Sequence, residues 1–479
     1  MNDINLSISK DSRPHYLRIA EGVRSAIRKG QVNPGESLPS SRVLAECLST
    51  HRQTIMAAME ELAAEGWITA QSRRRYRICE TLPNQFFEPR LTKEIPVGDR
   101  KWRLVRGQNI DFPPALPEKG FSFKSGMPDL RIFPVSELRS CLADVLARSS
   151  KKFLNYDQPE GQIELLDPLR VYLRRVRAVS GRQILVTNGS QEAIYLLGQL
   201  LIAPGDKVGV EEKGYRPAWE ALRAAGAELV PIPIDEEGID PDALHTLVKR
   251  HRLRLVYSTP LHQYPTTVTL PVSRRIRIYE LLSQFGVPFL EDDYDHEFHY
   301  RCQPLAPLAA SDPEGLILYV STFSKVLFPS ARLGFMAVPA SIAKPLASLK
   351  RISTRQNDGI LQAAVGRWMK EDGFERHLRR MRRRYEERRN ALVESLEAAK
   401  AEGYPVNWKT PDGGMALWLD VGQDSDALSR RAQKLGVYVT AESQYHLKPS
   451  ASRFLRLGFA NQTPEEIRGG IKRLLEAFR

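Results

Sequence analysis

A lysine at position 325 lies in the segment S-T-F-S-K-V-L-F-P-S-A-R, with hydroxyl residues before it and an arginine after it. Thr322 and Ser324 precede Lys325, and Arg332 follows it. A lysine amine attacks carbonyl carbons, whereas hydroxyls and a guanidinium group bind phosphate. A single lysine is more often a surface residue. The segment therefore predicts chemistry only if other parts of the chain supply matching groups.

Three other segments supply such groups, each at the end or on the length of an expected strand. V-T-N-G-S-Q-E runs from strand through glycine to helix, which leaves the N–H groups of Ser190 and Gln191 free to bind an anion. V-P-F-L-E-D-D-Y-D ends a buried strand in crowded carboxylates, which serve a cation, a metal or a protonated base. R-F-L-R-L-G-F places Arg453 and Arg456 on a strand.

These groups together match the requirements of pyridoxal 5'-phosphate. Its aldehyde forms a Schiff base with a lysine, and a carboxylate keeps its pyridine nitrogen protonated. An arginine grips its phosphate through two hydrogen bonds. Four coincident strand-end motifs favour this interpretation of Lys325 over a surface lysine.

Composition limits where such a site operates. The chain has 479 residues, 42% hydrophobic and 27% charged, which predicts a soluble protein of two to four domains. It has no apolar run of about 18 residues and no secretory pattern at its start, and its four cysteines are scattered. We therefore expect a cytoplasmic protein without a metal site.

The elements that position Lys325 occupy residues 119–479. Strand-like runs such as Q-I-L-V-T, K-V-G-V-E and L-I-L-Y-V-S alternate there with helical segments. This alternation predicts an α/β domain with a largely parallel sheet, whose sites lie at the carboxyl ends of strands. The arginine-rich block 376–389 is interpreted as a solvated helix face, with Leu378, Met381 and Tyr385 turned inward. Residues 80–118 contain six prolines and predict a linker.

Residues 1–79 predict a different domain, with three helices followed by a small hairpin. This is the plan of a winged helix-turn-helix, in which the second helix of the helix-turn-helix pair, here the third helix of the domain, enters the major groove of DNA. The alternative is a three-helix domain without a DNA role, which charge does not exclude: residues 1–80 carry 12 basic and 9 acidic side chains. The candidate DNA-binding residues are Ser41, Arg42, Thr50, His51, Arg52, Gln53, Thr54 and Arg74.

Both parts resemble known families. Residues 119–479 resemble fold type I pyridoxal-phosphate enzymes of the class I aminotransferase group, and residues 10–79 resemble GntR-type winged-helix repressors through G-Q-V-N-P-G-E-S-L-P-S-S-R-V-L-A. The two in this order resemble the MocR subfamily of transcriptional regulators. That resemblance implies a homodimer that binds a double-stranded DNA operator and a small amino-acid-like effector.

The resemblance also implies a role for each site residue. Lys325 forms the Schiff base with pyridoxal phosphate. Asp292 pairs with the pyridine nitrogen, Tyr294 bonds the ring hydroxyl and Tyr215 stacks on the ring. Arg456 binds an effector carboxylate, and Tyr156 reaches the phosphate of the partner subunit. The phosphate is held by Ser190, Gln191, Thr322, Ser324 and Arg332.

Three departures from the family pattern matter. Aminotransferases have Asn-Pro-Thr-Gly where this chain has Tyr264-Pro265-Thr266-Thr267, so the asparagine that bonds the ring hydroxyl is missing. We expect Thr267 to avoid the positive φ that a glycine tolerates. Lys213 stands where proline is usual, which predicts a looser Tyr215 loop, and the hairpin tip S-R-R-R lacks its usual glycine.

Three functions follow from this resemblance. The first is a regulator in which an effector amine displaces Lys325 and re-spaces two DNA-binding domains. The second is a working aminotransferase with an accessory N-terminal domain, which the missing asparagine disfavours. The third is a regulator that responds to pyridoxal phosphate itself.

Overall fold

The computed structural model describes residues 8–9, 11–71, 75–82, 120–124, 126–148, 154–300 and 305–478. The chain divides into two compact units, Met1–Val105 and Arg106–Arg479. The predicted boundaries at 79 and 118 stay predictions, since residues 83–119 lie outside the described residues. None of the described helices is long and apolar enough to cross a membrane.

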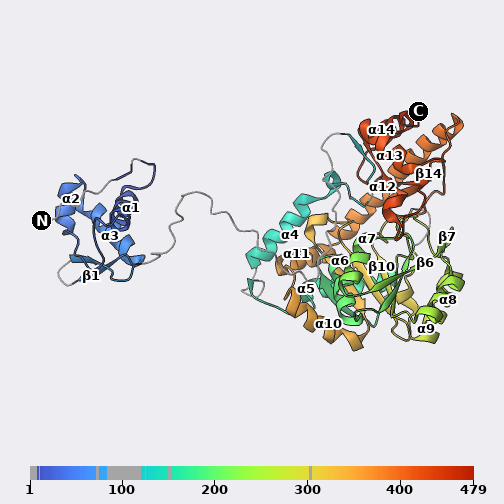
Figure 1. Ribbon diagram of the computed structural model, residues 1–479, viewed down its shortest axis with the longest axis horizontal. Coiled ribbons are helices and arrows are strands. Elements are labelled where there is room, and N and C mark those ends of the chain that lie inside the picture. Colours follow the sequence, from blue (N-terminus) through green and yellow to red (C-terminus); the bar gives the residue numbers. More distant parts are fainter. Residues whose placement is uncertain are drawn as a thin grey trace. The chain divides into compact units, whose positions relative to one another are not determined.

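The N-terminal unit packs three helices against a two-stranded hairpin (Figure 1). Ile19, Ile55, Met59 and Leu62 are fully buried at its centre, at the spacing expected of helices with one apolar face. Arg24 bonds both oxygens of Glu65 at 2.8 Å, which ties the first helix to the end of the third. The elements are α1 (His15–Arg28), α2 (Ser41–Cys47), α3 (Arg52–Ala64), β1 (Ile68–Gln71) and β2 (Arg75–Ile78).

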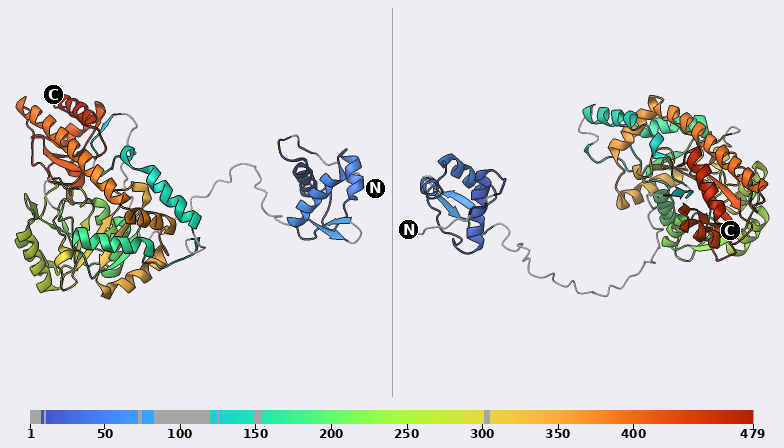
Figure 2. Two further views of the ribbon diagram at one scale, coloured as in Figure 1. Left: turned by 180° about the vertical axis from the view of Figure 1, so that it is seen from behind. Right: turned by 90° about the horizontal axis from the view of Figure 1, so that it is seen from above.

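A seven-stranded sheet forms the centre of the larger unit, with helices on both faces (Figures 1 and 2). All neighbouring strands are parallel except β12, which is antiparallel to both neighbours. The strands in spatial order are β4 (Gln183–Thr187), β12 (Gly334–Val338), β11 (Ile317–Thr322), β10 (Phe289–Asp293), β9 (Leu255–Ser258), β5 (Lys207–Glu211) and β6 (Glu228–Ile232).

Alternate residues of these strands enter two separate cores, which is why the strands read as continuous apolar runs. Leu290 packs in one core with α6 (Ser190–Leu201), α7 (Arg216–Ala224) and α10 (Ala340–Ser353). Phe289 packs in the other. Helices that contribute to that second core include α4 (Val135–Arg148), α5 (Ile163–Arg177), α8 (Pro241–His251), α9 (Val272–Phe285), α11 (Gly359–Lys370) and α12 (Gly373–Ala401).

A smaller antiparallel sheet follows toward the C-terminus, in the order β13 (Asn407–Trp408), β14 (Ala416–Asp420), β17 (Phe454–Gly458) and β16 (Thr440–Ala441). Two helices complete this part, α13 (Ser425–Lys434) and α14 (Pro464–Glu476). The first described strand of the unit, β3 (Phe121–Ser122), pairs in parallel with β15 (Val437–Tyr438). The start of the larger unit is therefore attached to its C-terminal part.

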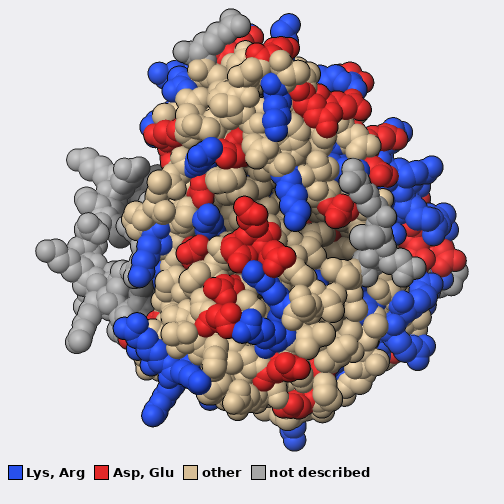
Figure 3. All heavy atoms as spheres, turned by 90° about the vertical axis from the view of Figure 1, so that its right-hand side faces the viewer, with Lys and Arg blue, Asp and Glu red and all other residues tan. Residues whose placement is uncertain are grey.

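The arginine-rich block lies on α12, where Leu378, Met381 and Tyr385 are buried as predicted. The prediction of a solvated face is wrong for its last two arginines. Arg388 is buried against Asp129, and Arg389 donates to the carbonyl of Pro411. On the face that Figure 3 shows, basic and acidic side chains are interspersed.

Candidate functional site

Lys325 lies three residues beyond the carboxyl end of β11. Its Nζ atom donates a 2.7 Å hydrogen bond to the carbonyl oxygen of Gly126. Burial lowers the pKa of its amine below 10.5, although the carboxylates of Asp295 and Asp292 oppose the shift. A lowered pKa increases the unprotonated fraction, which is the nucleophilic form.

Three strands bring the predicted phosphate-binding residues together. Thr187, Gly334 and Thr322 face one another across β4, β12 and β11, so the loops that follow β4 and β11 leave the sheet side by side. A Cβ atom on Gly334 would lie 2.7 Å from Gly189 Cα and 2.9 Å from the Ser321 carbonyl oxygen. Glycine is therefore required at position 334 by close approach.

We call the polar groups of these two loops the cup: they belong to Ser190, Gln191, Thr322, Ser324 and Arg332. Ser190 and Gln191 begin α6 after Gly189, whose φ is 80°. Arg332 closes the cup, with Nη2 donating to the Asn188 carbonyl at 2.5 Å, and its side chain is exposed. Ser324 N and Oγ both bond Thr322 Oγ1, at 3.1 and 2.9 Å. Free N–H groups, two hydroxyls and an arginine suit a phosphate.

The three carboxylates at the end of β10 have different surroundings. Burial raises the pKa of Glu291 to about 7, and its oxygens accept N–H bonds from Leu308 and Ala309. Burial alone would raise the pKa of Asp293, but Arg177, at 2.5 Å, contributes to holding it below its usual value. These two carboxylates already have partners within the fold.

Asp292 is the carboxylate with a missing partner. Its Oδ2 atom accepts a 2.9 Å bond from Tyr257, whereas its buried Oδ1 atom has no hydrogen-bond partner among the described residues. Burial raises its pKa to about 7. A buried acceptor without a donor is rare in folded proteins. The N–H group of a protonated pyridine is the type of donor that this oxygen lacks, so the residues present fit pyridoxal phosphate.

Aromatic side chains surround Arg456 on β17. Arg456 is buried, its guanidinium carbon lies 4.4 Å from the centre of the Tyr264 ring, and its Nη1 donates to the Pro265 carbonyl. Tyr264 also contacts the rings of Tyr215, Tyr294 and Tyr445, with centroids 5.5, 6.0 and 5.4 Å away. The Tyr294 hydroxyl donates to the His262 carbonyl at 3.0 Å. The tyrosine that replaces the family's asparagine thus fills the middle of this cluster.

Two expectations about neighbouring loops are wrong. Thr267 adopts a φ of 65°, the conformation that it was expected to avoid. Its N–H bonds the Gln263 carbonyl at 2.7 Å, and such closure offsets a cost of ~1–2 kcal/mol for a left-handed residue. The Tyr215 loop is not loosened by Lys213, because Lys213 Nζ forms a 2.8 Å ion pair with Glu442.

Tyr156 lies apart from the residues above. Its side chain is 70% exposed, and the guanidinium carbon of Arg355 lies 4.0 Å from the centre of its ring. The structure therefore does not bring Tyr156 into the cup within one chain, and its assignment to a partner subunit stays a prediction.

The candidate DNA-binding residues gather at the start of α3. His51 precedes the helix, and His51, Arg52 and Gln53 are exposed, while Thr50 and Thr54 are partly buried. Arg42 on α2 is also exposed. Ser41 is buried, and its Oγ accepts a 3.3 Å hydrogen bond from Arg52 Nε. Ser41 therefore orients the Arg52 side chain. Arg74 lies outside the described residues.

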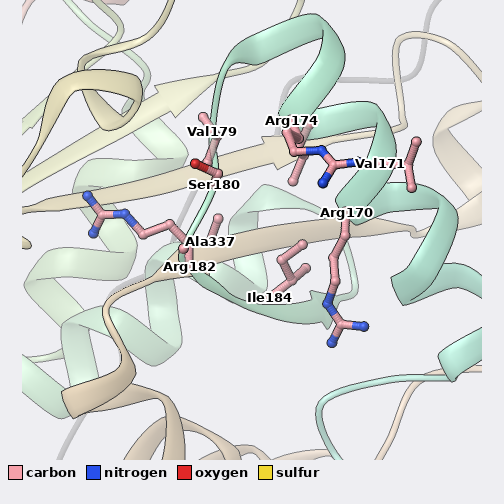
Figure 4. Close-up of a pocket in the computed structure, with 10 residues that line it drawn as sticks. Arg170, Val171, Arg174, Val179, Ser180, Arg182, Ile184 and Ala337 are labelled. Carbon is pink, nitrogen blue, oxygen red and sulfur yellow. The ribbon is translucent and has the colours of Figure 1, made fainter.

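A surface pocket of about 250 Å³ lies elsewhere, between the end of α5 and the start of β4 (Figure 4). None of the predicted site residues lines it. Two of its arginines already have acidic partners, since Arg170 bonds Asp167 and Arg182 bonds Asp312. The pocket is therefore separate from the candidate site.

The sequence analysis missed Tyr257, the hydrogen-bond donor to Asp292. A signal for it existed: Tyr257 faces Leu290 across β9 and β10, and Asp292 lies two residues further on the same face. It also missed Tyr264 as the neighbour of Arg456, because that contact joins the large sheet to the small one.

Comparison with known proteins agrees with both units. Residues 15–78 match the family "Bacterial regulatory proteins, gntR family", and residues 122–474 match "Aminotransferase class I and II". A regulator of Rhizobium meliloti, "Probable rhizopine catabolism regulatory protein MocR", is 30% identical over 475 residues, which cover 97% of this chain and 94% of that protein.

Two solved aminotransferase structures each resemble three quarters of this chain. A kynurenine aminotransferase of Pyrococcus horikoshii is 30% identical with a TM-score of 0.70, and covers 75% of this chain and 90% of its own. The α-aminoadipate aminotransferase LysN of Thermus thermophilus, solved with N-(5'-phosphopyridoxyl)-L-leucine, is 30% identical with a TM-score of 0.69, and covers 75% and 92%. The aminotransferase fold that these structures share uses pyridoxal phosphate. Since the full-length relative is a regulator, this chain belongs to the MocR-type GntR regulators, in which a GntR helix-turn-helix domain precedes a domain of the class I and II aminotransferase family.

Proposed function

We propose that the protein binds an operator in double-stranded DNA and responds to a small molecule with an amino group through pyridoxal phosphate held at Lys325. The observation that carries the proposal is Oδ1 of Asp292, which is buried and has no hydrogen-bond partner in the part of the chain that the structure describes. Asp292 lies on the strand next to the one that leads to Lys325. A carboxylate oxygen in this position is a suitable acceptor for the N–H group of a cationic ring nitrogen. The N-terminal unit supplies the helix that would read the DNA.

Each predicted residue has a defined task in this proposal. The cup of Ser190, Gln191, Thr322, Ser324 and Arg332 holds the phosphate, Asp292 accepts the ring N–H, and Tyr215 covers the ring. When bound, pyridoxal phosphate supplies an aldehyde carbon to which either Lys325 or an effector amine bonds. Arg456 holds an effector carboxylate, and Tyr294 donates to the ring hydroxyl after leaving the His262 carbonyl.

The response to an effector then follows from Lys325. While Lys325 is bonded, its side chain is fixed at the end of β11. An effector amine bonded there in its place would leave Lys325 free to move, and the contacts between the loops of the large sheet and the C-terminal part would change. In a homodimer this changes how two recognition helices meet two half-sites. Tyr156, exposed in one chain, would contact the partner's phosphate cup.

The missing asparagine favours a regulatory function over that of a working aminotransferase. Tyr264 occupies that position and stacks on Arg456, so the ring hydroxyl lacks its usual amide donor. The test is the formation of keto acid from a panel of amino acids with pyruvate as acceptor. Steady turnover at the roughly 1–10³ s⁻¹ of ordinary enzymes would replace the regulatory proposal with an enzymatic one.

Arg52→Ala should weaken binding to an operator selected by the wild-type protein from random DNA by about 1–3 kcal/mol, because Arg52 is exposed at the start of the recognition helix. The change should also relax discrimination at one base position. Fluorescence anisotropy on the selected operator and its single-base variants measures both effects.

Arg42→Ala is the matched control, since Arg42 is exposed on the preceding helix and is expected to contact phosphate. It should weaken selected and random DNA alike and reduce the salt dependence of binding. Arg52 would lose its assignment if Arg52→Ala bound every base variant as the wild type does.

A further inference from the structure

The loop that carries Tyr215 is joined to the C-terminal part of the larger unit by backbone hydrogen bonds. Gly214 N donates to the Tyr445 carbonyl at 2.9 Å, and Leu447 N donates to the Glu212 carbonyl at 2.9 Å. Between these bonds Lys213 forms an antiparallel bridge with His446. The residue whose ring covers the cofactor site is therefore two positions from this junction.

A partly buried ion pair crosses the same junction. Lys213 Nζ lies 2.8 Å from Glu442 Oε1, and the two side chains are 21% and 5% exposed. The other carboxylate oxygen, Oε2, accepts the N–H groups of Arg453 and Phe454 at 2.9 and 3.2 Å. Those residues lead into β17, which carries Arg456. One carboxylate thus links the Tyr215 loop to the start of the Arg456 strand.

A second contact leads from Lys213 to the same arginine. The Lys213 carbonyl accepts a 2.8 Å bond from Gln263 Nε2. Gln263 precedes Tyr264, whose ring lies 4.4 Å from the Arg456 guanidinium carbon. Lys213 is therefore linked to both neighbours of Arg456, to the start of β17 through Glu442 and to Tyr264 through Gln263.

We propose that Lys213 and Glu442 are positioning residues that hold Arg456 in register with the Tyr215 loop, and thereby select effectors that carry a carboxylate as well as an amino group. This inference rests on the proposed function, because it presupposes that Lys325 holds pyridoxal phosphate. Neither residue touches the effector. Both act through Arg456, which is the group that faces the carboxylate.

The charge of Glu442 is maintained by its contacts. Burial alone would raise its pKa, but the N–H of Arg453 and the ammonium of Lys213 lower it below the usual value. Without Lys213, Oε1 of Glu442 loses its nearest cation and keeps only His446, whose Nε2 lies 3.3 Å away. The two N–H groups that begin β17 then have a weaker anchor.

The test compares two reagents on the full-length protein saturated with pyridoxal phosphate. Aminooxyacetate carries a carboxylate, and methoxyamine lacks one. With either, the aminooxy nitrogen forms the C=N bond to the cofactor carbon while the C=N bond to Lys325 breaks. The two hydrogens of the reagent nitrogen end on the Lys325 amine. The decay of the visible absorbance of the lysine-bound cofactor gives both rate constants, and their ratio measures the preference for a carboxylate.

Lys213→Met should lower the ratio of the aminooxyacetate rate to the methoxyamine rate about fivefold, with the methoxyamine rate unchanged. Lys213→Arg should restore the ratio, since it keeps the cation. Glu442→Gln keeps an oxygen for the two N–H groups and should give the same loss as Lys213→Met. Arg456→Lys changes the proposed carboxylate-binding residue itself, so its ratio shows the largest loss of preference that is expected.

Arg216→Met is the matched control, because Arg216 begins α7, its side chain is 71% exposed, and it lies 3.9 Å from Glu220. It should leave both rates unchanged. An unchanged ratio in Lys213→Met and Glu442→Gln, or equal changes in both rates, would overturn the inference while leaving the proposed function intact. A wild-type protein without visible absorbance would overturn both.

Discussion

Lys325→Ala should abolish the visible absorbance that the wild-type protein acquires with pyridoxal phosphate, because no other described lysine lies at the end of β11 beside Asp292. The variant should also lose any change in DNA binding that amines cause. Its basal DNA binding should persist, since the recognition helix belongs to the other compact unit. Absorbance spectra and anisotropy on the selected operator measure the two properties.

Lys350→Met is an informative control for this prediction. Lys350 is fully buried, its Nζ donates to the Pro159 carbonyl, and burial lowers its pKa to about 8. It is therefore another amine of lowered pKa in the same unit. Lys350→Met should keep the absorbance even if it is less stable. Absorbance that survives in Lys325→Ala and disappears in Lys350→Met would move the attachment site.

Asp292→Asn should weaken the binding of pyridoxal phosphate by about 1.5–3 kcal/mol, because it removes a charged acceptor for the ring N–H. The same change should stabilise the cofactor-free protein at neutral and alkaline pH. The carboxyl group of Asp292 has its pKa raised by burial from 3.8 to about 7, so the folded chain favours its protonated form. A single substitution is thus expected to have opposite effects on the free and the loaded protein.

The pH dependence follows from the direction of that shift. The favourable contribution of protonated Asp292 is fully present below 3.8 and is lost as pH rises through about 7. It amounts to about 4 kcal/mol. Cofactor-free Asp292→Asn should therefore gain stability relative to the wild type between pH 4 and pH 8. Urea unfolding at several pH values measures this difference.

Asp293→Asn is the control of opposite sign. The pKa of Asp293 lies below its usual value, in part through Arg177, so its contribution is present above 3.8 and lost as pH falls through the lowered value. Asp293→Asn should therefore destabilise the protein most at neutral pH. If the two variants showed the same dependence of stability on pH, the two carboxyl groups would not have the different surroundings that the structure gives them.

Much of this site could be predicted from sequence, because most of its residues lie at the carboxyl ends of strands, which a sequence pattern can locate. The register of β4, β12 and β11 brings Ser190, Thr322 and Arg332 together without any long-range information beyond strand order. The alternation of strand-like runs with helical segments also predicted the largely parallel sheet. These features depend on local pattern, which a single sequence contains.

The contacts between the two sheets could not be predicted in this way. Lys213 and Glu442 are 229 positions apart, and no periodicity relates them. The ion pair of Arg388 with Asp129 could not be predicted either, because Asp129 lies on a segment distant in the sequence. The run of arginines on the helix predicted exposed side chains, and this buried pair was missed. Thr267 accepts a positive φ because Gln263 closes its turn, which a comparison with a glycine motif does not show.

The parallel pairing of β3 with β15 has a mechanical consequence. Phe121 and Ser122 are among the first described residues of the larger unit and pair with Val437 and Tyr438. The N–H groups of Phe121 and Phe123 donate to the carbonyl oxygens of Gly436 and Tyr438. The chain that arrives from the N-terminal unit is thus tethered to the part of the fold that carries Arg456, and not to the seven-stranded sheet. Any displacement of that part is therefore expected to move Phe121 and Ser122 with it.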